Sequence, residues 1–314
     1  MIFSALKKAG ILGMNRRLGS YILPHNPRKF YPLVDDKVET AALLHSHKIP
    51  TPANFLVIES YGELRNLHFE LENLSDFVIK PARGSQGNGI LVVHEVIKSE
   101  DDIKTPSFRS TKGIKSIQDI QYHISSILSG LYSLAGFNDR AIIQEKLSIH
   151  PLFERLSPSG IPDIRIIVFK GFPVMAMIRL ATEASGGRAN LHQGAIGCGI
   201  EIATGLLTHA VHRNSSISRH PDTDLPLKGI QIPFWDEALL LASRCFDITG
   251  LGYLGVDIVM DPQKGPVLLE MNARPGLSIQ TANLSGLVPR LERVEGVLER
   301  LSPEDRVVVS KQWF

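Results

Sequence analysis

A glycine-rich loop between two predicted strands constrains the fold of this chain more than any other stretch. Residues 77–90 read FVIKPARGSQGNGI, an apolar run followed by a loop that contains three glycines. Backbone N–H groups can surround a phosphate where side chains are absent. Residues 90–97, ILVVHEVI, are rich in β-branched side chains and predict a second strand. A Walker A loop or a dinucleotide-binding fingerprint would open a helix instead, so both are disfavoured, and a plain hairpin turn is the alternative.

The composition excludes several classes of protein. The chain has 314 residues, of which 43% are hydrophobic and 21% charged, as in a soluble globular protein of two or three lobes. A net charge of +2 is too small to predict nucleic-acid binding. The two cysteines, Cys198 and Cys245, lack metal-ligand spacing and predict buried thiols in a reducing compartment. We therefore expect a cytoplasmic protein.

The N-terminal segment needs separate consideration because it is basic. Lys7, Lys8, Arg16 and Arg17 interrupt its apolar residues, and no stretch of the chain approaches the roughly 18 uncharged residues of a membrane span. A short amphipathic basic segment permits peripheral contact with a membrane. A solvated helix face is the favoured interpretation.

The order of predicted elements indicates an α+β protein. Asp35 or Asp36 can cap a helix in which Val38, Ala41, Ala42 and Leu44 keep a helical period. A strand at 49–58, a helix near 61–67 and the strand before the glycine loop follow. Residues 98–140 are polar at first and then helical, with a core stripe of Ile120, Ile124, Ile127, Leu128, Leu131 and Leu134. AIIQEKL, residues 141–147, predicts a short buried strand that leads into a hinge.

A hairpin with charged residues on one face is predicted at residues 163–183. DIRIIVFKGFPVMAMIRLATE turns at Lys170 and Gly171. If Phe169 pairs with Pro173, Asp163 lies opposite Arg179, and period-two alternation puts Arg165 on the same face. The loop SGGRANLHQGA then contributes Arg188, Asn190 and His192, before a further hairpin through Ile200 and Thr204. Surface ion pairing is the alternative explanation for each arginine taken singly.

A later hairpin brings oxygen ligands together. In GYLGVDIVMDPQKGPVLLEMNARPG, residues 261–265 form the turn, so that Asp257 lies about opposite Glu270, and Asn272 shares a face with Glu270. Buried carboxylates need a compensating charge, and carboxylate and amide oxygens suit Mg²⁺ or Mn²⁺. Partly exposed acids at a hairpin end are the alternative.

These motifs together resemble a known superfamily. DDK at 35–37, the glycine loop, IIQEKL, DIR, RANLHQGA, GVDIV and LLEMNARPG occur in the order found in ATP-grasp proteins. They look most like the ribosomal-protein glutamate ligase branch and the related alpha-L-glutamate ligase-like proteins, to which NPRKFYPLVDDK is also similar. The resemblance covers residues 32 to about 290.

The resemblance implies an ATP-grasp fold in which two α+β lobes bind ATP and Mg²⁺ or Mn²⁺. It implies a domain of residues 37–145 that includes the 98–140 insertion, a domain of residues 146–314, and an N-terminal extension, residues 1–36, in place of the usual preceding lobe. The implied nucleotide-binding residues are Lys37, Lys80, Gly84, Ser85, Gln86, Gly87, Gly89, Gln144, Glu145, Lys146, Leu147 and Glu154. The implied metal ligands are Asp257, Glu270 and Asn272, the implied catalytic residues are Arg165, Asn190 and Arg274, and the implied substrate-binding residues are Asp163, Arg179, Arg188 and His192.

The activity implied is ATP-dependent ligation of a carboxylate to an amine through an acylphosphate. Such a reaction needs positioning and cations rather than a nucleophilic side chain. Glutamate is the acid that the resemblance favours, with a protein, peptide or glycan-linked acceptor. A phosphotransferase and a catalytically silent nucleotide-binding scaffold are the alternatives. The motifs do not indicate whether the chain forms a homo-oligomer.

Overall fold

The computed structural model describes every residue except 1, 85–86, 99–104, 134–135 and 159. The chain divides into two compact units, each of which we describe by itself. The small unit comprises Asp36–Ala42 and Pro52–Leu147, and the large unit comprises Met1–Asp35, Leu43–Thr51 and Ser148–Phe314. This division differs from the expected boundaries in grouping residues 1–35 and 43–51 with the C-terminal half of the chain.

The small unit is a six-stranded antiparallel sheet with helices on one face. Its strand order is β1-β6-β2-β3-β4-β5. The elements are β1 (Asn54–Ile58), η3 (Tyr61–Asn66), α6 (Leu67–Leu71), β2 (Phe77–Pro81), β3 (Leu91–Ile97), β4 (Ser107–Ser110), β5 (Gly113–Lys115), α7 (Ile117–Leu128) and β6 (Ala141–Gln144). The helix α5 (Lys37–Ser46) begins in this unit. The predicted strands on both sides of the glycine loop are confirmed as the antiparallel pair β2 and β3.

The segment 98–140 differs from its prediction in two ways. A two-stranded hairpin, β4 and β5, precedes the helix and extends the sheet. The helix α7 keeps its apolar stripe buried but ends at Leu128, because Gly130 adopts a left-handed conformation with φ of +83°. Leu131 therefore leaves the stripe and is 68% exposed, while Leu134 lies outside the described residues. Ser116 caps the N-terminus of α7 in a reciprocal arrangement with Asp119.

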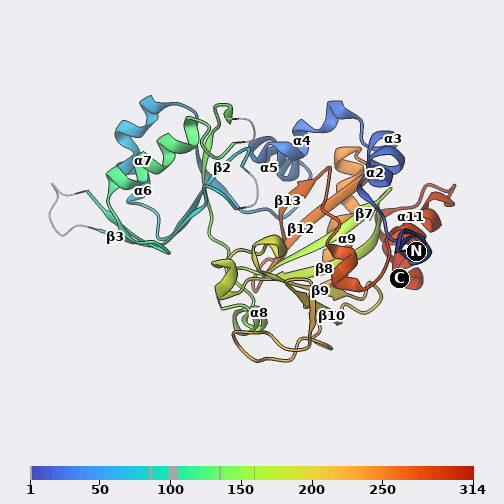
Figure 1. Ribbon diagram of the computed structural model, residues 1–314. Coiled ribbons are helices and arrows are strands. Elements are labelled where there is room, and N and C mark those ends of the chain that lie inside the picture. Colours follow the sequence, from blue (N-terminus) through green and yellow to red (C-terminus); the bar gives the residue numbers. More distant parts are fainter. Residues whose placement is uncertain (1, 85–86, 99–104, 134–135, 159) are drawn as a thin grey trace. The chain divides into compact units, whose positions relative to one another are not determined.

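The large unit is a seven-stranded antiparallel sheet covered on both faces (Figure 1). Its order is β11-β10-β9-β8-β7-β12-β13. The strands are β7 (Asp163–Phe169), β8 (Phe172–Leu180), β9 (Ile196–Ile200), β10 (Leu207–His212), β11 (Ser215–Ile217), β12 (Tyr253–Asp261) and β13 (Gly265–Asn272). The helical elements are α1 (Ile2–Lys8), α2 (Met14–Arg16), η1 (Arg17–Ile22), α3 (Leu23–His25), η2 (Arg28–Phe30), α4 (Pro32–Asp35), α8 (Pro151–Leu156), η5 (Glu183–Ser185), η6 (Leu191–Gln193), α9 (Trp235–Thr249), α10 (Ile279–Asn283), α11 (Val288–Glu295) and α12 (Pro303–Trp313).

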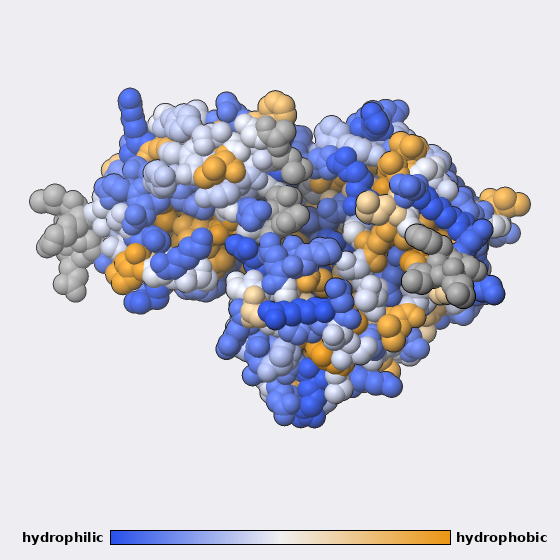
Figure 2. All heavy atoms as spheres, viewed as in Figure 1, coloured by the Kyte–Doolittle hydropathy of each residue, from blue (hydrophilic) through white to orange (hydrophobic). Residues whose placement is uncertain are grey.

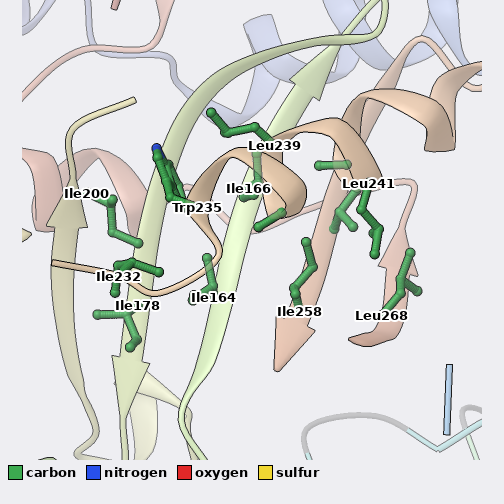
Figure 3. Close-up of a cluster of buried hydrophobic side chains, with 14 of the residues drawn as sticks. Ile164, Ile166, Ile178, Ile200, Ile232, Trp235, Leu239, Leu241, Ile258 and Leu268 are labelled. Carbon is green, nitrogen blue, oxygen red and sulfur yellow. The ribbon is translucent and has the colours of Figure 1, made fainter. Parts of the chain in front are cut away.

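Alternation along the strands separates two apolar clusters. Ile164 and Ile166 of β7 and Ile258 of β12 pack with α9, whose Trp235 and Leu239 belong to the same cluster (Figure 3). The intervening residues Ile167 and Phe169 of β7 point to the other face and pack with α10, α11 and the N-terminal segment. The polar residues of β7, Asp163 and Arg165, belong to this second face but lie beyond its apolar part. The fold thus leaves one end of this face for charged side chains.

Both cysteines are buried, as predicted. Cys198 lies on β9 and Cys245 on α9, and burial raises the pKa of each thiol to about 12. Among the described residues, no helix is long and apolar enough to cross a bilayer.

Candidate functional site

The charged end of the large unit's sheet holds a carboxylate–arginine network of Asp163, Arg165, Arg179 and Asp257. Arg165 donates from Nε and Nη2 to the two carboxylate oxygens of Asp257, at 2.7 and 2.5 Å. Arg179 binds Asp163 in the same two-pronged way and donates a further 2.8 Å hydrogen bond from Nη2 to Asp257 Oδ2. Such paired contacts fix the geometry of both guanidinium groups.

Strand register explains why these four side chains meet. Asp163 lies opposite Arg179 across β7 and β8, as predicted, and Asp257 lies opposite Arg165 across β12 and β7. The predicted pairing of Phe169 with Pro173 is wrong, because Phe169 pairs with Phe172 across a two-residue turn. A β-bulge between Ile167 and Val168 restores the predicted register at the charged end.

Burial makes this network electrostatically strong. Only 2% of the Asp257 side chain is exposed, and 12–14% of each of the other three. Burial alone would raise the pKa of Asp257, but Arg165 and Arg179 outweigh it and lower that pKa to about 2. Burial and the neighbouring Asp257 charge raise the pKa of Asp163 despite its pairing with Arg179. Asp257 is therefore the carboxylate of this pair that stays ionised to the lower pH.

Two further oxygen-bearing side chains lie beside Asp257. Glu270 is its cross-strand neighbour on β13, as predicted, and Asn272 donates from Nδ2 to Glu270 Oε1 at 3.0 Å. Among the described residues, no three acids, histidines or cysteines form a ready-made metal centre. The donor chemistry of Asp257, Glu270 and Asn272 nevertheless suits Mg²⁺, since Asp257 accepts three hydrogen bonds and a carboxylate offers about four lone-pair positions.

The glycine-rich loop after β8 places three more of the predicted residues. The Asn190 side chain accepts a 3.0 Å hydrogen bond from the backbone N–H of His192 and so caps η6. Arg188 is exposed and makes a long contact of 3.4 Å to Gln193. His192 lines a small cavity of about 60 Å³ together with Arg213. These residues form a polar loop, but none of their hydrogen bonds reaches the carboxylate–arginine network.

Arg274 has a different environment from the one expected of a catalytic residue. Its Nη2 donates to Asp35 Oδ2 at 3.0 Å, and its guanidinium lies 5.0 Å from the centre of the Tyr31 ring. About half of each charged side chain is exposed. Within the large unit, Arg274 therefore ties the end of α4 to the residues after β13.

In the small unit, Lys37 contacts the start of the glycine loop. Its Nζ donates to the carbonyl oxygen of Gly84 at 2.8 Å, and its backbone N–H donates to Ala82 at 3.1 Å. Gly87 and Gly89 have positive φ values, which a side chain would strain, while Ser85 and Gln86 lie outside the described residues. Lys80 is on β2, opposite Ile142 of β6. By alternation it lies on the sheet face away from the α7 core.

A buried aspartate that the sequence did not single out as a site residue organises this loop. Asp36 Oδ2 accepts from Arg83 Nε at 2.9 Å, and Asp36 Oδ1 accepts from Arg140 Nη2 at 2.7 Å. Asp36 also caps α5 through the N–H of Val38, which confirms one of the two predicted caps. Asp139 accepts hydrogen bonds from the backbone N–H groups of Arg83 and Arg140. In the sequence, the two aspartates before Lys37 and the arginine before Gly84 were the features that could have indicated the ion pair between Asp36 and Arg83.

The predicted hinge residues lie at the end of β6. Gln144 donates to Asn54 Oδ1 at 2.9 Å, and Glu145 Oε2 accepts from the Ala53 N–H at 3.1 Å. Lys146 pairs with Asp76 at 2.5 Å, and Leu147 is buried. Glu154 is an exposed residue of α8 in the large unit. The side chains of 144–146 thus bind the surrounding chain, and the backbone N–H of Glu145 donates to the Ala53 carbonyl at 2.8 Å.

Comparison with known proteins identifies the superfamily. The family model described as "Sugar-transfer associated ATP-grasp" matches residues 16–296. The superfamily prediction and the ATP-grasp fold are therefore confirmed, and the matching family is a different one from the glutamate-ligase branch that the motifs resembled. A search of curated proteins found no match to the sequence.

Solved structures of ATP-grasp ligases are similar at low sequence identity. The ligase PsnB in complex with a minimal precursor has a TM-score of 0.45 and 15% identity over 91% of this chain and 63% of its own. D-alanine–D-alanine ligase from Bacillus anthracis has a TM-score of 0.44 and 12% identity over 90% of this chain and 66% of its own. D-alanyl-alanine synthetase A from Vibrio cholerae has a TM-score of 0.46 and 11% identity over 90% of this chain and 66% of its own. The chain spans about two thirds of the length of these enzymes.

Proposed function

Since the chain belongs to the sugar-transfer-associated ATP-grasp family, we propose that it is an ATP-dependent ligase that joins a carboxylate to an amine. The observation that carries this proposal is the set of oxygen groups from Asp257, Glu270 and Asn272 beside two arginines. Three carboxylates, counting Asp163, here meet two guanidinium groups, and a cation would balance the excess negative charge. A bound Mg²⁺ would hold the nucleotide phosphates and offset the charge that grows on them.

The chain's own cations have separate roles in this proposal. Arg165 uses Nε and Nη2 for Asp257, which leaves Nη1 without a hydrogen bond within the described part of the chain. This nitrogen can meet the transferred phosphate. Lys80 and Lys37 would bind the phosphates of ATP, and Lys37 would exchange its contact with Gly84 for one with the nucleotide. Arg179 makes three hydrogen bonds to carboxylates, so it acts as a positioning residue rather than as a substrate ligand.

The reaction proposed has two balanced steps. A substrate carboxylate oxygen attacks the γ-phosphorus of ATP, the bond to the β-phosphate oxygen breaks, and ADP leaves. An amine then attacks the acyl carbon, inorganic phosphate leaves, and the amine loses a proton. Glutamate remains the first acid to test, and the family's association with sugar transfer supports an acceptor that carries a sugar. The glycine-rich loop that carries Asn190, beside the small cavity at His192, is the proposed location for that acceptor.

Trapping of the acylphosphate tests this function. Hydroxylamine intercepts an activated carboxylate, so protein, ATP, Mg²⁺ and the correct acid should give a hydroxamate. Lys80→Ala and Arg165→Ala should each abolish the product, because Lys80 would hold the phosphates in the ground state and Arg165 would bind the negative charge that grows on them during transfer. Arg109→Ala is the matched control, because Arg109 forms an exposed ion pair with Glu95 on the small unit's sheet.

The alternatives give different products in the same assay. A phosphotransferase would release ADP and yield a phosphoester, with no hydroxamate from any acid. A silent nucleotide-binding protein would bind ATP without turnover across the whole acid panel. Either result would replace the ligase proposal.

A further inference from the structure

The first 34 residues have charge of one sign only. They hold six lysines and arginines and no aspartate or glutamate, although the whole chain has 34 basic and 32 acidic residues. The remaining residues consequently have more acidic than basic side chains. Basic segments of this kind are attracted to anionic surfaces.

The helical run from α2 through η1 to α3 also exposes apolar side chains. Met14, Leu18 and Leu23 are 70%, 48% and 54% exposed, whereas Tyr21 and Ile22 are buried in the core. Met14 and Leu18 are four residues apart. Leu18 and Leu23 are five residues apart across η1. Because η1 is a π-helix, five residues make roughly one turn. The three exposed side chains therefore lie on one side of the run.

The fold holds this run in place. The N–H of Leu12 donates to Gln280 Oε1 at 2.8 Å, and Gln280 Nε2 donates back to the Leu12 carbonyl at 3.1 Å. Asn26, which is buried, donates to the Tyr253 carbonyl at 2.7 Å and accepts from the Tyr253 N–H. The run is thus anchored at both ends, so the exposure of its apolar residues is set by the fold and not by fraying of a terminus.

Most of the segment's cations are available for a partner. Arg16 pairs with Glu292 of α11 at 2.6 Å, and Arg17 donates to the Pro275 carbonyl. The other four, Lys7, Lys8, Arg28 and Lys29, are exposed and have no carboxylate partner within the described residues. Glu292 and Glu295 of α11 are the carboxylates that face this segment, at Arg16 and His25. Figure 2 shows hydrophobic and strongly hydrophilic residues next to one another where Figure 1 places α2 and α3.

We propose that these residues form a membrane-binding face, comprising Lys7, Lys8, Met14, Leu18, Leu23 and Lys29, which docks on the surface of an anionic lipid bilayer. The lysines would lie at the headgroups, and the three apolar side chains would enter the boundary between headgroups and acyl chains. A purely solvated helix face accounts for the lysines but not for three large apolar side chains exposed along one side. The inference is independent of the proposed ligase activity.

Co-sedimentation with vesicles tests the proposal without ATP or substrate. The full chain should bind vesicles of equal parts phosphatidylglycerol and phosphatidylcholine at least tenfold more strongly than vesicles of phosphatidylcholine alone. Lys7→Glu with Lys8→Glu should lower binding at least tenfold, because attraction to anionic lipid falls with each cation lost. Lys112→Glu with Lys228→Glu, two exposed lysines elsewhere in the chain, is the charge-matched control and should change binding less than twofold.

The apolar contribution needs its own variant. Leu18→Ser with Leu23→Ser should remove the part of vesicle binding that survives 0.5 M NaCl, and an unchanged thermal unfolding midpoint would show that the variant is folded. Equal binding to both kinds of vesicle, or equal loss in the charge-matched control, would overturn the proposal. Binding to double-stranded DNA with the same dependence on Lys7 and Lys8 would overturn the lipid assignment.

Discussion

Two buried aspartates, each bonded to two arginines, have opposite relations to possible ligands. Asp257 in the large unit is 2% exposed and accepts three hydrogen bonds, all from guanidinium groups. Asp36 in the small unit is 4% exposed and accepts four, two of them from backbone N–H groups of α5. Each aspartate keeps one oxygen that accepts a single hydrogen bond within the described residues, Oδ1 of Asp257 and Oδ2 of Asp36, so the two differ in the groups that bind them rather than in spare acceptor positions.

The surroundings extend this difference. Asp257 has Glu270 as its cross-strand neighbour, so two carboxylates lie next to each other on adjacent strands. Asp36 has arginines that come from the glycine loop and from the residue before β6, so its bonds tie separate parts of the small unit together. We infer that similar aspartate–arginine chemistry serves the proposed ligand binding in the large unit and holds the glycine loop in the small unit.

Loss of charge at Asp257 should have the largest effect. Asp257→Asn leaves Arg165 buried without an ionised partner, so we expect about 3 kcal/mol less free energy of unfolding and about 10² or more lost in turnover. Glu270→Gln should lose comparable turnover but less than about 1 kcal/mol of stability, because within the described residues Glu270 accepts one side-chain hydrogen bond, from Asn272. Urea denaturation and the hydroxamate assay measure the two effects. Full activity of Glu270→Gln would contradict the metal assignment.

Asp36 should affect stability first and ATP use second. An asparagine oxygen can still cap α5, so Asp36→Asn removes the charge that faces Arg83 and Arg140 and one of the two arginine hydrogen bonds, at about 2 kcal/mol. Asp36→Ala should cost about 1 kcal/mol more, since the cap is lost too. If Asp36 holds the base of the glycine loop, KM for ATP should rise more than kcat falls. Glu95→Gln, which breaks an exposed pair with Arg109, is the control. A fall in kcat at unchanged KM would place Asp36 in a different role.

Asp163 of the large unit and Asp36 of the small unit should make contributions to stability that respond to pH with opposite sign. The pKa of Asp163 is raised to about 6, so the folded chain binds more protons than the unfolded chain between about pH 4 and 6, and the free energy of unfolding falls as pH rises through this range. Burial would raise the pKa of Asp36, but Arg140 and Arg83 outweigh it and lower that pKa from the ordinary 3.8. The contribution of Asp36 is therefore present above about pH 4 and is lost as pH falls further.

Urea denaturation between pH 4 and 6.5 measures the first of these slopes. Asp163→Asn should reduce the fall in stability across this range by about 1 to 2 kcal/mol, while Asp36→Asn should leave the slope unchanged. If both variants keep the slope of the native chain, another group is responsible for it.

The large unit's network could be predicted because, in paired strands, the spacing of residues along the sequence determines which side chains are neighbours. Residues two apart share a face, and a hairpin fixes cross-strand partners, so Asp163 with Arg179 and Asp257 with Glu270 followed from local sequence. The bulge near Val168 was not predictable from the pattern. It compensated for a turn that was one residue shorter than expected, and the charged end kept its register.

The small unit's network could not be predicted in the same way. Asp36 lies 47 residues before Arg83 and 104 residues before Arg140. The three side chains meet only because α5, the glycine loop and the residue before β6 pack together. No periodic pattern in the local sequence predicts a contact between residues so far apart along the chain. The hairpin of β4 and β5 was missed for a related reason, since two strands of four and three residues are too short to show a clear alternation.

The smallest effect on stability is expected for the ion pair of Arg274 and Asp35, which is more exposed than the two aspartate–arginine networks. Arg274 and Asp35 are about half exposed, so their pair should contribute less than about 1 kcal/mol to stability, which a double-mutant cycle of Arg274→Ala and Asp35→Ala would measure. The same variants separate a structural from a catalytic role. If Arg274 only ties α4 to the chain after β13, both single variants should lower kcat/KM equally and slightly. If Arg274 leaves Asp35 to meet the substrate, Arg274→Ala alone should lower kcat/KM strongly, whereas Asp35→Ala should leave it unchanged or raise it, because the guanidinium would then be free to bind.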